Sequence, residues 1–437
     1  MDNETVSDRL RTPAAAPTPV VDRLPLLDAI RGVALGGILL ANLMSFMGAD
    51  MMGQPARRAM AGGSAGEAVL FAVNWLVEGK FYSIFSILLG VGFALQAKRA
   101  TDRGMSPDRF ARFFRRRMGV LIVIGLTHMY ALWAGDILTL YGVMGLLLPW
   151  LMTWPAWRRS ALMAGLFAVP LATHALVLAS GGTLDPRPPF AAFGVDLREQ
   201  LGAAGRATLE LFARGEAMDY WIWNVSTAVV RPGTYLQAGR PAKVLALFLL
   251  GAWIGTFVLP RLQSMRRALV TLAIVGGTAG LLGSYVYASI KAATGSSFLL
   301  SDTGLIQTAA YTFGTTPLAL AYMAAAALAW TTAPGRAMLE WFVPLGRMAL
   351  SVYLSQTLIQ LALFSSLGFG LAGQVPLALL PPVAAAILVT QREFCAWWLA
   401  DHRHGPAEWL WRRSTYGAAV RQADATARAS AGTARSK

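Results

Sequence analysis

The chain has 437 residues, of which 55% are hydrophobic and only 14% charged, and its mean hydropathy is +0.49. These values argue against a soluble protein of two or three domains and favour one membrane-embedded body. The formal charge of +15 does not indicate nucleic-acid binding, because Lys and Arg collect in alternate connections between apolar blocks, as the positive-inside rule describes.

Residues 1–22 are rich in Ala and Pro and have no basic start before an apolar core, so we expect a disordered leader and not a cleavable signal. Ten apolar runs follow, several longer than the roughly 20 residues that cross a bilayer. They are 27–47, 80–96, 118–134, 136–154 and 161–179, then 242–259, 268–290, 305–331, 343–364 and 376–399. The sequence therefore predicts an all-α, polytopic membrane bundle of about ten transmembrane helices, with five-span halves at 23–180 and 242–412.

The connections between the runs predict the orientation. Lys and Arg crowd 98–117, 158–159, 261–267 and a basic tail at 413–437, which all fall on one side if ten spans are correct. Both termini are then cytoplasmic. The extracytoplasmic connection 181–241 has mixed charge, and we expect it to pack along the membrane surface. The apolar stretch 67–77 is too short to span, which favours a re-entrant or interfacial helix.

Ionisable side chains inside a span are candidates for function, because they are costly there unless they face a cavity or a partner. His128 lies ten residues beyond Met118, or about 15 Å along a helix axis. Asp136 follows after eight residues, with only 133–135 available for the turn. Such a turn must be buried in protein or line a wet cavity. We predict that His128 and Asp136 share a pocket open toward the outside. The alternative is a His satisfied by a neighbouring group, with Asp136 as a helix N-cap.

Other polar residues are expected in the outer half of the first two spans. Asn42 lies eleven residues beyond Arg31, and Glu78 and Lys80 precede the second span. The alternative for the last two is a salt bridge or snorkelling to the interface. At the cytoplasmic end of the first span, Arg31 either pairs with Asp28 or holds an anionic group.

The ninth span is also unusually polar. It contains Arg347, Tyr353 and Gln356, which are candidates for substrate binding or for polar contacts between helices. The basic connection 98–117 either fixes topology or recruits an anionic lipid or phosphorylated nucleotide. The four His and the single Cys have no spacing typical of zinc, so we expect no metal site.

Several motifs resemble those of a known family. They are Arg23 with Leu27-Asp28-Ala29-Ile30-Arg31-Gly32, Glu78-Gly79-Lys80-Phe81-Tyr82-Ser83-Ile84-Phe85-Ser86, Gly125-Leu126-Thr127-His128, Trp133-Ala134-Gly135-Asp136-Ile137-Leu138, Gly346-Arg347-Met348-Ala349-Leu350-Ser351 and Gly405-Pro406-Ala407-Glu408-Trp409. Together they resemble the YeiB-like bacterial membrane proteins, whose C-terminal half is a domain of unknown function. The resemblance covers nearly the whole chain and implies a multi-pass protein of the bacterial plasma (inner) membrane.

That family is distantly similar to the transmembrane acyltransferases, including acyltransferase-three proteins and heparan-alpha-glucosaminide N-acetyltransferase. The shared features here are Leu27, Asp28, Arg31, Gly32 and Asn42. The similarity implies transfer of an acyl group from acyl-CoA to an envelope sugar or lipid, with no permanently bound cofactor and with membrane lipids as partners. The N-acetyltransferase has its catalytic His after the first span. Residues 48–66 contain no His, which leaves His128 as the replacement.

The leading hypothesis is thus a membrane acyltransferase. His128 would act as general base, Asp136 would orient it, and Asn42 would donate to the oxyanion. Arg31 and the basic connection would hold the donor's phosphates. A proton-coupled or small-molecule transporter, with Glu78 in a relay, is the alternative from another class. A non-catalytic membrane partner or sensor is the third. Broken helices in both halves would favour transport, and a one-sided cytoplasmic tunnel would favour transfer.

Overall fold

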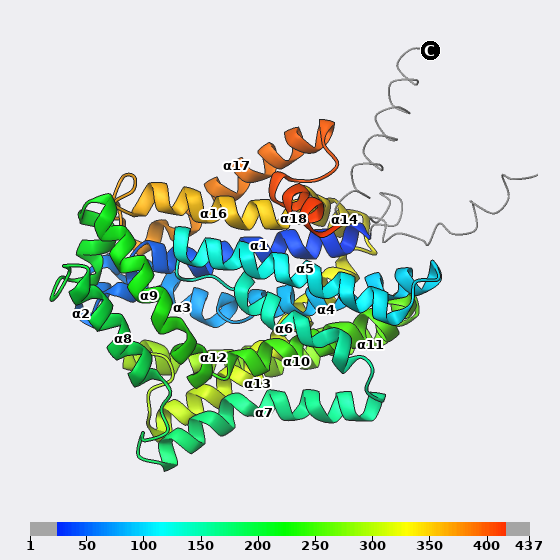
Figure 1. Cartoon of the computed structure of the whole chain (residues 1–437), viewed down its shortest axis with the longest axis horizontal. Helices are drawn as coiled ribbons and strands as arrows, with labels where there is room; N and C mark the ends of the chain where they lie inside the picture. The colour runs from blue at the N-terminus through cyan, green and yellow to red at the C-terminus, as the bar shows by residue number, and fades with distance from the viewer. Residues whose placement is uncertain (1–23, 417–437) are drawn as a thin grey trace, which may run out of the picture.

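The computed structural model describes residues 24–416, and this part of the chain is helical with no β-strand. The predicted all-α class is therefore confirmed. Figure 1 shows that most of the long helices run close to the longest axis of the molecule. Seven helices in this range are long and apolar enough to cross a membrane. They are Pro25–Phe46, Ser64–Asp102, Ala156–Ala179, Arg240–Ser264, Arg266–Thr294, Asp302–Ala329 and Leu377–Asp401.

Two shorter apolar helices, Leu138–Leu151 and Ala349–Phe364, fall within predicted spans. The helix Pro107–Thr127, which covers much of another predicted span, opens with basic residues. The count of about ten spans stays a prediction.

The N-terminal half is built around five longer helices. They are α1 (Pro25–Phe46), α4 (Phe81–Asp102), α5 (Pro107–Thr127), α6 (Leu138–Leu151) and α7 (Ala156–Ala179). Between α1 and α4 lie η3 (Ala49–Met51), α2 (Gln54–Ala61), α3 (Ser64–Ala72) and the π-helical turn η4 (Val73–Val77). The expected re-entrant or interfacial segment 67–77 thus falls on α3 and η4. A second π-helical turn, η5 (His128–Leu132), ends α5.

The connection between the halves contains α8 (Arg187–Gln200), η6 (Glu210–Arg214) and α9 (Ala217–Gln237). The C-terminal half follows as α10 (Arg240–Trp253), η7 (Ile254–Val258), η8 (Leu259–Ser264), α11 (Arg266–Thr271), η9 (Leu272–Gly276), α12 (Gly277–Thr294), α13 (Asp302–Ala329), α14 (Ala333–Glu340), α15 (Val343–Arg347), α16 (Ala349–Phe364), η10 (Leu377–Leu379), α17 (Leu380–Asp401) and α18 (Pro406–Tyr416).

Glycines set the close helix contacts that position the polar residues. A Cβ at Gly90 of α4 would lie 2.1 Å from the Phe248 carbonyl oxygen, and one at Gly251 of α10 would lie 2.0 Å from that of Ile87. A Cβ at Gly125 of α5 would lie 2.3 Å from the backbone nitrogen of Thr139. Small residues let helix backbones approach this closely in membrane proteins. The glycines therefore fix α4 against α10, and α5 against α6.

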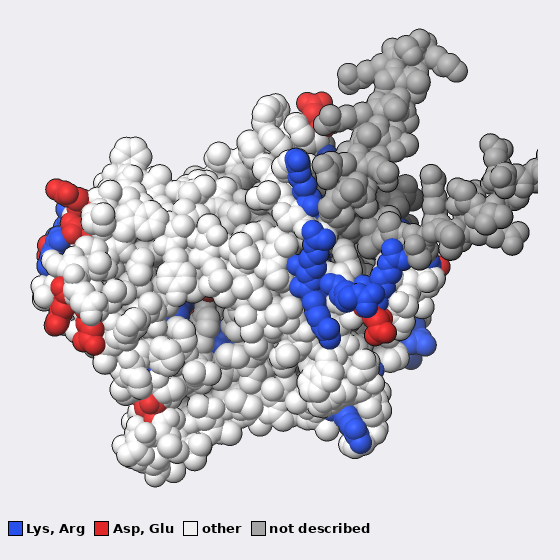
Figure 2. Space-filling view, in the orientation of Figure 1, with Lys and Arg blue, Asp and Glu red and all other residues white. Residues whose placement is uncertain are grey.

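The charges divide along the long axis of the molecule. Figure 2 shows charged residues gathered toward the two ends with a wide uncharged band between them, and Lys and Arg prevail toward the end where α4 leads into α5. Both ends of the described chain lie near this end of the molecule, because Leu24 and Trp411 line the same cavity. We call this the basic end. Its cytoplasmic location remains a prediction from the positive-inside rule. The leader 1–22 and nearly all of the tail 413–437 lie outside the described residues, although α18 runs on to Tyr416.

Candidate functional site

The segment between α5 and α6 is an irregular turn held by α9. The Trp133 N–H donates to the His128 carbonyl at 2.7 Å and closes η5. Asn224 of α9 accepts from the Ala134 N–H at 2.6 Å through Oδ1, and its Nδ2 donates to the Met129 and Tyr130 carbonyls at 3.1 Å. Irregular backbone at membrane depth must be satisfied by protein. The connection 181–241 therefore contributes directly to this turn, in addition to the surface packing that the sequence predicts.

His128 is held between an acidic group and a hydroxyl. Its Nδ1 lies 3.0 Å from Asp136 Oδ1, and its Nε2 lies 2.9 Å from Thr357 Oγ1 of α16. The other carboxylate oxygen of Asp136 accepts from the Thr139 N–H at 2.8 Å. An ionised Asp136 keeps the proton on Nδ1, which leaves Nε2 to accept from Thr357. The order carboxylate, imidazole, hydroxyl is that of a catalytic triad, which is recognised by geometry and not by position in the chain.

Two features of the His128–Asp136 pair differ from what the sequence predicts. Asp136 bonds to His128 and also accepts from the Thr139 N–H in the first turn of α6, whose N-cap residue is Ile137, so the pairing occurs together with a contact to the helix start. Only 1% of His128 and 2% of Asp136 is exposed, and neither side chain lines the cavity described next. The expectation of a pocket open toward the outside is therefore wrong for this structure, because α9 and α16 cover the turn.

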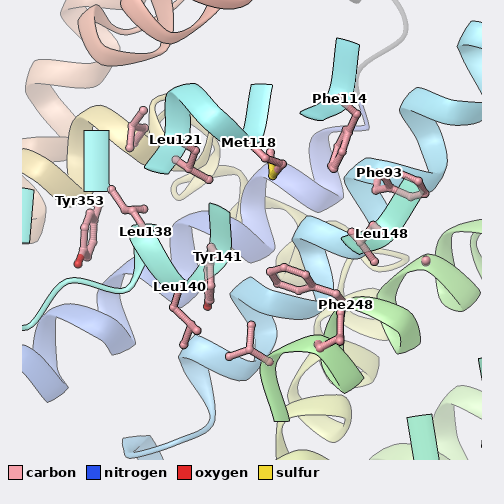
Figure 3. Close-up of a cluster of buried hydrophobic side chains, with 14 of the residues drawn as sticks. Phe93, Phe114, Met118, Leu121, Leu138, Leu140, Tyr141, Leu148, Phe248 and Tyr353 are labelled. Carbon is pink, nitrogen blue, oxygen red and sulfur yellow. The ribbon is translucent and has the colours of Figure 1, made fainter. Parts of the chain in front are cut away.

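A cavity of about 340 Å³ extends from the basic end into the bundle. Its walls are apolar and come from α1, α4, α5, α6 and α16. Figure 3 shows part of this lining, with Phe114 and Met118 of α5 toward one side and Leu138 and Tyr353 toward the other. The charged and polar groups around it are Asp28, Arg31, Gln96, Arg99, Arg117, Arg347, His404, Glu408 and Arg412.

The charge around the cavity is mainly positive. Arg31 Nη1 donates to Asp28 Oδ1 at 2.6 Å, so the pairing expected for these two residues is present at the cavity. Glu408 accepts from the backbone N–H groups of Leu350 and Ser351, so its carboxylate is hydrogen-bonded to the first turn of α16. The Nε of Arg347 is buried and has no hydrogen-bond partner within residues 24–416. This end of the cavity therefore suits an anion.

The inner part of the cavity reaches the neighbours of His128. Tyr353 lines the cavity, and its ring centroid lies 5.2 Å from that of His128. Ile137, which follows Asp136, lines it as well. The structure thus brings together His128, Asp136 and Tyr353, with the cavity ending one side chain away from the imidazole.

The remaining predicted residues lie in other surroundings. Asn42 is half-buried in α1, and among residues 24–416 its side chain makes no hydrogen bond with the His128 pair. The Gln356 amide donates to the Leu35 carbonyl at 3.4 Å, which fits a contact between helices. Glu78 pairs with Lys291 at 2.8 Å, so the alternative of a Glu78 to Lys80 salt bridge is wrong.

Sequence reasoning missed Thr357, Asn224, Tyr235 and Lys243. Lys243 could have been found, because it is an ionisable residue inside the apolar run 242–259. Thr357 lies four residues after Tyr353 and therefore on the same helix face, which is a weaker signal. Nothing in the sequence singles out Asn224, or Tyr235, whose hydroxyl donates to the Asp136 carbonyl at 2.7 Å.

The fold and these buried polar groups define a helical protein of membrane type. Residues 255–418 match the family model described as "Protein of unknown function (DUF418)". The chain is 27% identical over 411 residues to the uncharacterized protein YxaH of Bacillus subtilis (strain 168), covering 92% of this chain and 96% of YxaH. It is 26% identical over 418 residues to the uncharacterized protein YeiB of Escherichia coli (strain K12), covering 91% and 98%.

A 39.9 kDa protein from the amylase 3' region of Bacillus acidopullulyticus is 26% identical over 410 residues, covering 92% and 96%. The chain is therefore similar to YeiB and YxaH over more than nine tenths of its length, and its residues 255–418 match the DUF418 model, as the resemblance of its motifs predicts. These relatives carry no activity in their descriptions, so the distant similarity to acyltransferases stays a prediction.

Proposed function

We propose that the chain is a membrane acyltransferase that moves an acyl group from acyl-CoA to a hydroxyl of an envelope sugar or lipid. One observation carries the proposal. A cavity with arginines around its basic end and apolar walls leads to Tyr353, one side chain away from a His–Asp pair. The cavity opens at one end of the bundle, as expected for a tunnel that admits an acyl donor. The basic end is then cytoplasmic, and the protein is a multi-pass protein of the bacterial inner membrane.

The donor would bind with its phosphates at the basic end. Arg31 and Arg347 offer planar guanidinium groups, which suit bidentate phosphate contacts. The apolar walls would take the pantetheine arm and the acyl chain. A volume of about 340 Å³ lies in the range typical of small-molecule sites.

His128 would act as general base at the inner end. The acceptor hydroxyl takes the place of Thr357 at Nε2, gives its proton to the imidazole and attacks the thioester carbonyl. The C–S bond breaks, and the departing CoA sulfur receives that proton, so that an ester and free CoA result. Asp136 holds the ring and stabilises its charged form. Tyr353 lies between the cavity lining and the imidazole, so rotation of its side chain would admit the thioester. Asn42 stays the proposed oxyanion donor.

The test compares envelope lipids and glycans by mass spectrometry in a strain lacking the protein, the wild type and a His128→Ala variant. His174→Ala is a matched control, because His174 is also 1% exposed and its Nδ1 lies 2.9 Å from the Thr308 hydroxyl, without a carboxylate partner. We expect a modification absent from the null strain and from His128→Ala and present in His174→Ala. The same modification in His128→Ala, at normal protein level, overturns the proposal.

A transporter is the second candidate, and one observation favours it. Both halves contain π-helical turns that adjoin apolar helices, at η4 and η5 in the first half and at η7 and η9 in the second. Such turns are frequent at functional sites, and broken helices are typical of transporters. Proton flux into proteoliposomes that is lost in Glu78→Gln would support transport over transfer. A non-catalytic partner or sensor would tolerate conservative changes at His128.

A further inference from the structure

A second buried cluster contains cations without carboxylate partners. Lys80, directly before α4, is 0% exposed, and its Nζ donates to the Asn74 carbonyl at 3.3 Å. Lys243 of α10 is 2% exposed, and its Nζ donates to Thr315 Oγ1 at 2.6 Å. Each ammonium group has three N–H donors and, among residues 24–416, donates one of these hydrogen bonds to a neutral oxygen.

Arg240 adds a third positive charge. Its guanidinium lies 5.5 Å from the ring centroid of Tyr82, and Lys243 Nζ lies 4.3 Å from that of Tyr311. Among residues 24–416, none of Lys80, Arg240 and Lys243 forms a salt bridge. The nearby carboxylate of Glu78 is bound by Lys291 at 2.8 Å and by the Tyr287 hydroxyl at 2.8 Å.

Arg240 and Lys243 line a small void, whereas Lys80 is not part of its lining and lies on the turn directly after Gly79. The volume of the void is about 10 Å³, and its lining includes Arg240, Lys243, Tyr82, Tyr311 and Thr312. This is close to the room that one water-sized group needs. Thr312 Oγ1 is buried and has no hydrogen-bond partner in the described part of the chain. Arg240, Lys243 and Thr312 thus offer donors around a space with room for about one oxygen atom of an oxyanion.

The turn that precedes α4 packs closely against α13. Gly79 has φ +84°, and a Cβ there would lie 2.7 Å from Thr315 Cγ2 and 2.8 Å from the Tyr311 ring. A glycine is therefore required for the turn that carries Lys80 to pack against α13. This turn holds the Lys80 ammonium group in the protein interior. Burial of an unpaired charge is unfavourable there.

Tyr235 connects this cluster with the His128 pair. Its hydroxyl donates to the Asp136 carbonyl at 2.7 Å, and its ring centroid lies 5.2 Å from the Arg240 guanidinium. A molecule bound in the cluster would therefore be a near neighbour of the turn that carries Asp136.

We propose that Lys80, Arg240 and Lys243 bind the oxyanion group, a phosphate or a carboxylate, of the acceptor molecule. The identity of the bound molecule as the acyl acceptor rests on the proposed acyl transfer, whereas the binding of an oxyanion by these cations does not. The three cations supply the positive charge, and the Thr312 hydroxyl supplies a neutral donor. An acceptor held in this way would carry its reacting hydroxyl on the side of Tyr235.

The test uses the full chain in neutral detergent and measures its unfolding temperature. The probes are sodium phosphate, sodium acetate and mixed micelles containing phosphatidylglycerol, each against sodium chloride or phosphatidylcholine at equal ionic strength. We expect at least one probe to raise the unfolding temperature in a saturable way. In Lys80→Met and Lys243→Met the half-saturating concentration should rise at least tenfold. Arg158→Met is the control, because Arg158 is exposed and lines neither cavity, and it should respond like the wild type.

Two results overturn the proposal. One is a wild type that responds to none of the three probes, which is expected if the lysines are uncharged in the folded protein. The other is an equal response in Lys80→Met, Lys243→Met and the wild type. If both Met variants fail to accumulate, Arg240→Gln takes their place, because Arg240 is only half-buried, and an unchanged response in that variant overturns the proposal as well.

Two comparisons refine the assignment. A response to phosphatidylglycerol alone identifies the source of the oxyanion as a lipid headgroup, and a response to free phosphate or acetate identifies a soluble acceptor. His128→Ala separates this site from the proposed function, because it should retain the anion response. An anion response without acyl transfer supports the oxyanion site and contradicts the proposed transferase. Acyl transfer without an anion response supports the transferase and contradicts the oxyanion site.

Discussion

His128 Nε2 and Thr357 Oγ1 lie 2.9 Å apart, although 229 residues separate them in the chain. His128 belongs to the N-terminal half, and Thr357 belongs to the region 255–418 that matches the family model. The candidate site therefore needs both halves of the protein. A C-terminal half expressed alone would carry Thr357 and Tyr353 without the imidazole that they contact.

Asp136→Asn should abolish most of the proposed activity and leave the fold intact. Asn keeps the size of the side chain and can still accept from the Thr139 N–H at the start of α6, but it no longer stabilises the charged imidazole or fixes its tautomer. We expect the rate of acyl transfer to fall by roughly two to four orders of magnitude, measured as product formed per amount of purified protein. A variant with wild-type rate would show that the pair is purely structural.

Thr357→Val should lower stability more than it lowers activity. The change leaves His128 Nε2 buried without a hydrogen bond, which costs about 1–3 kcal/mol, measured by unfolding in detergent. Because the acceptor hydroxyl replaces Thr357 in the proposed reaction, the turnover should stay within about tenfold of the wild type. Thr357→Ser, which keeps the hydroxyl, is the control. Complete loss of activity in a folded Thr357→Val would instead assign Thr357 a covalent role.

Arg347→Gln should weaken binding of the donor. A charge-assisted hydrogen bond contributes about 1.5–3 kcal/mol, so the dissociation constant for CoA should rise by roughly tenfold or more, and less so at high salt. Arg158→Gln is the control, because Arg158 of α7 is exposed and does not line the cavity. Calorimetric titration with CoA measures the effect. Equal affinity in Arg347→Gln and the wild type would place the donor elsewhere.

Gly125→Ala should destabilise the hairpin that carries the candidate site. The new Cβ would lie 2.3 Å from Thr139 N, and overpacking of this kind costs about 1–3 kcal/mol or more. Gly119→Ala on the same helix meets nothing within 4 Å and should be neutral or stabilising by roughly 0.5–1 kcal/mol. The two unfolding temperatures in detergent give the comparison. A tolerated Gly125→Ala would mean that α5 and α6 can separate without loss.

Much of the fold was predictable from the sequence, because hydropathy is a local property of each segment. Apolar runs and their basic connections identified a helical membrane protein, and the depth of His128 together with the short turn to Asp136 predicted that the two share a site. The position of Arg31 at the end of the first span followed from the same pattern.

The tertiary structure alone decided which helix faces meet. A helix that is apolar on all sides has no amphipathic stripe to show which face turns inward, so the sequence could not place Thr357 against His128 or Tyr235 against Asp136. Close contacts at Gly90, Gly125 and Gly251 fix the rotation and spacing of the helices. For the same reason the sequence marked Lys80 as a candidate without Lys243, and only packing placed Lys243 and Arg240 around one void.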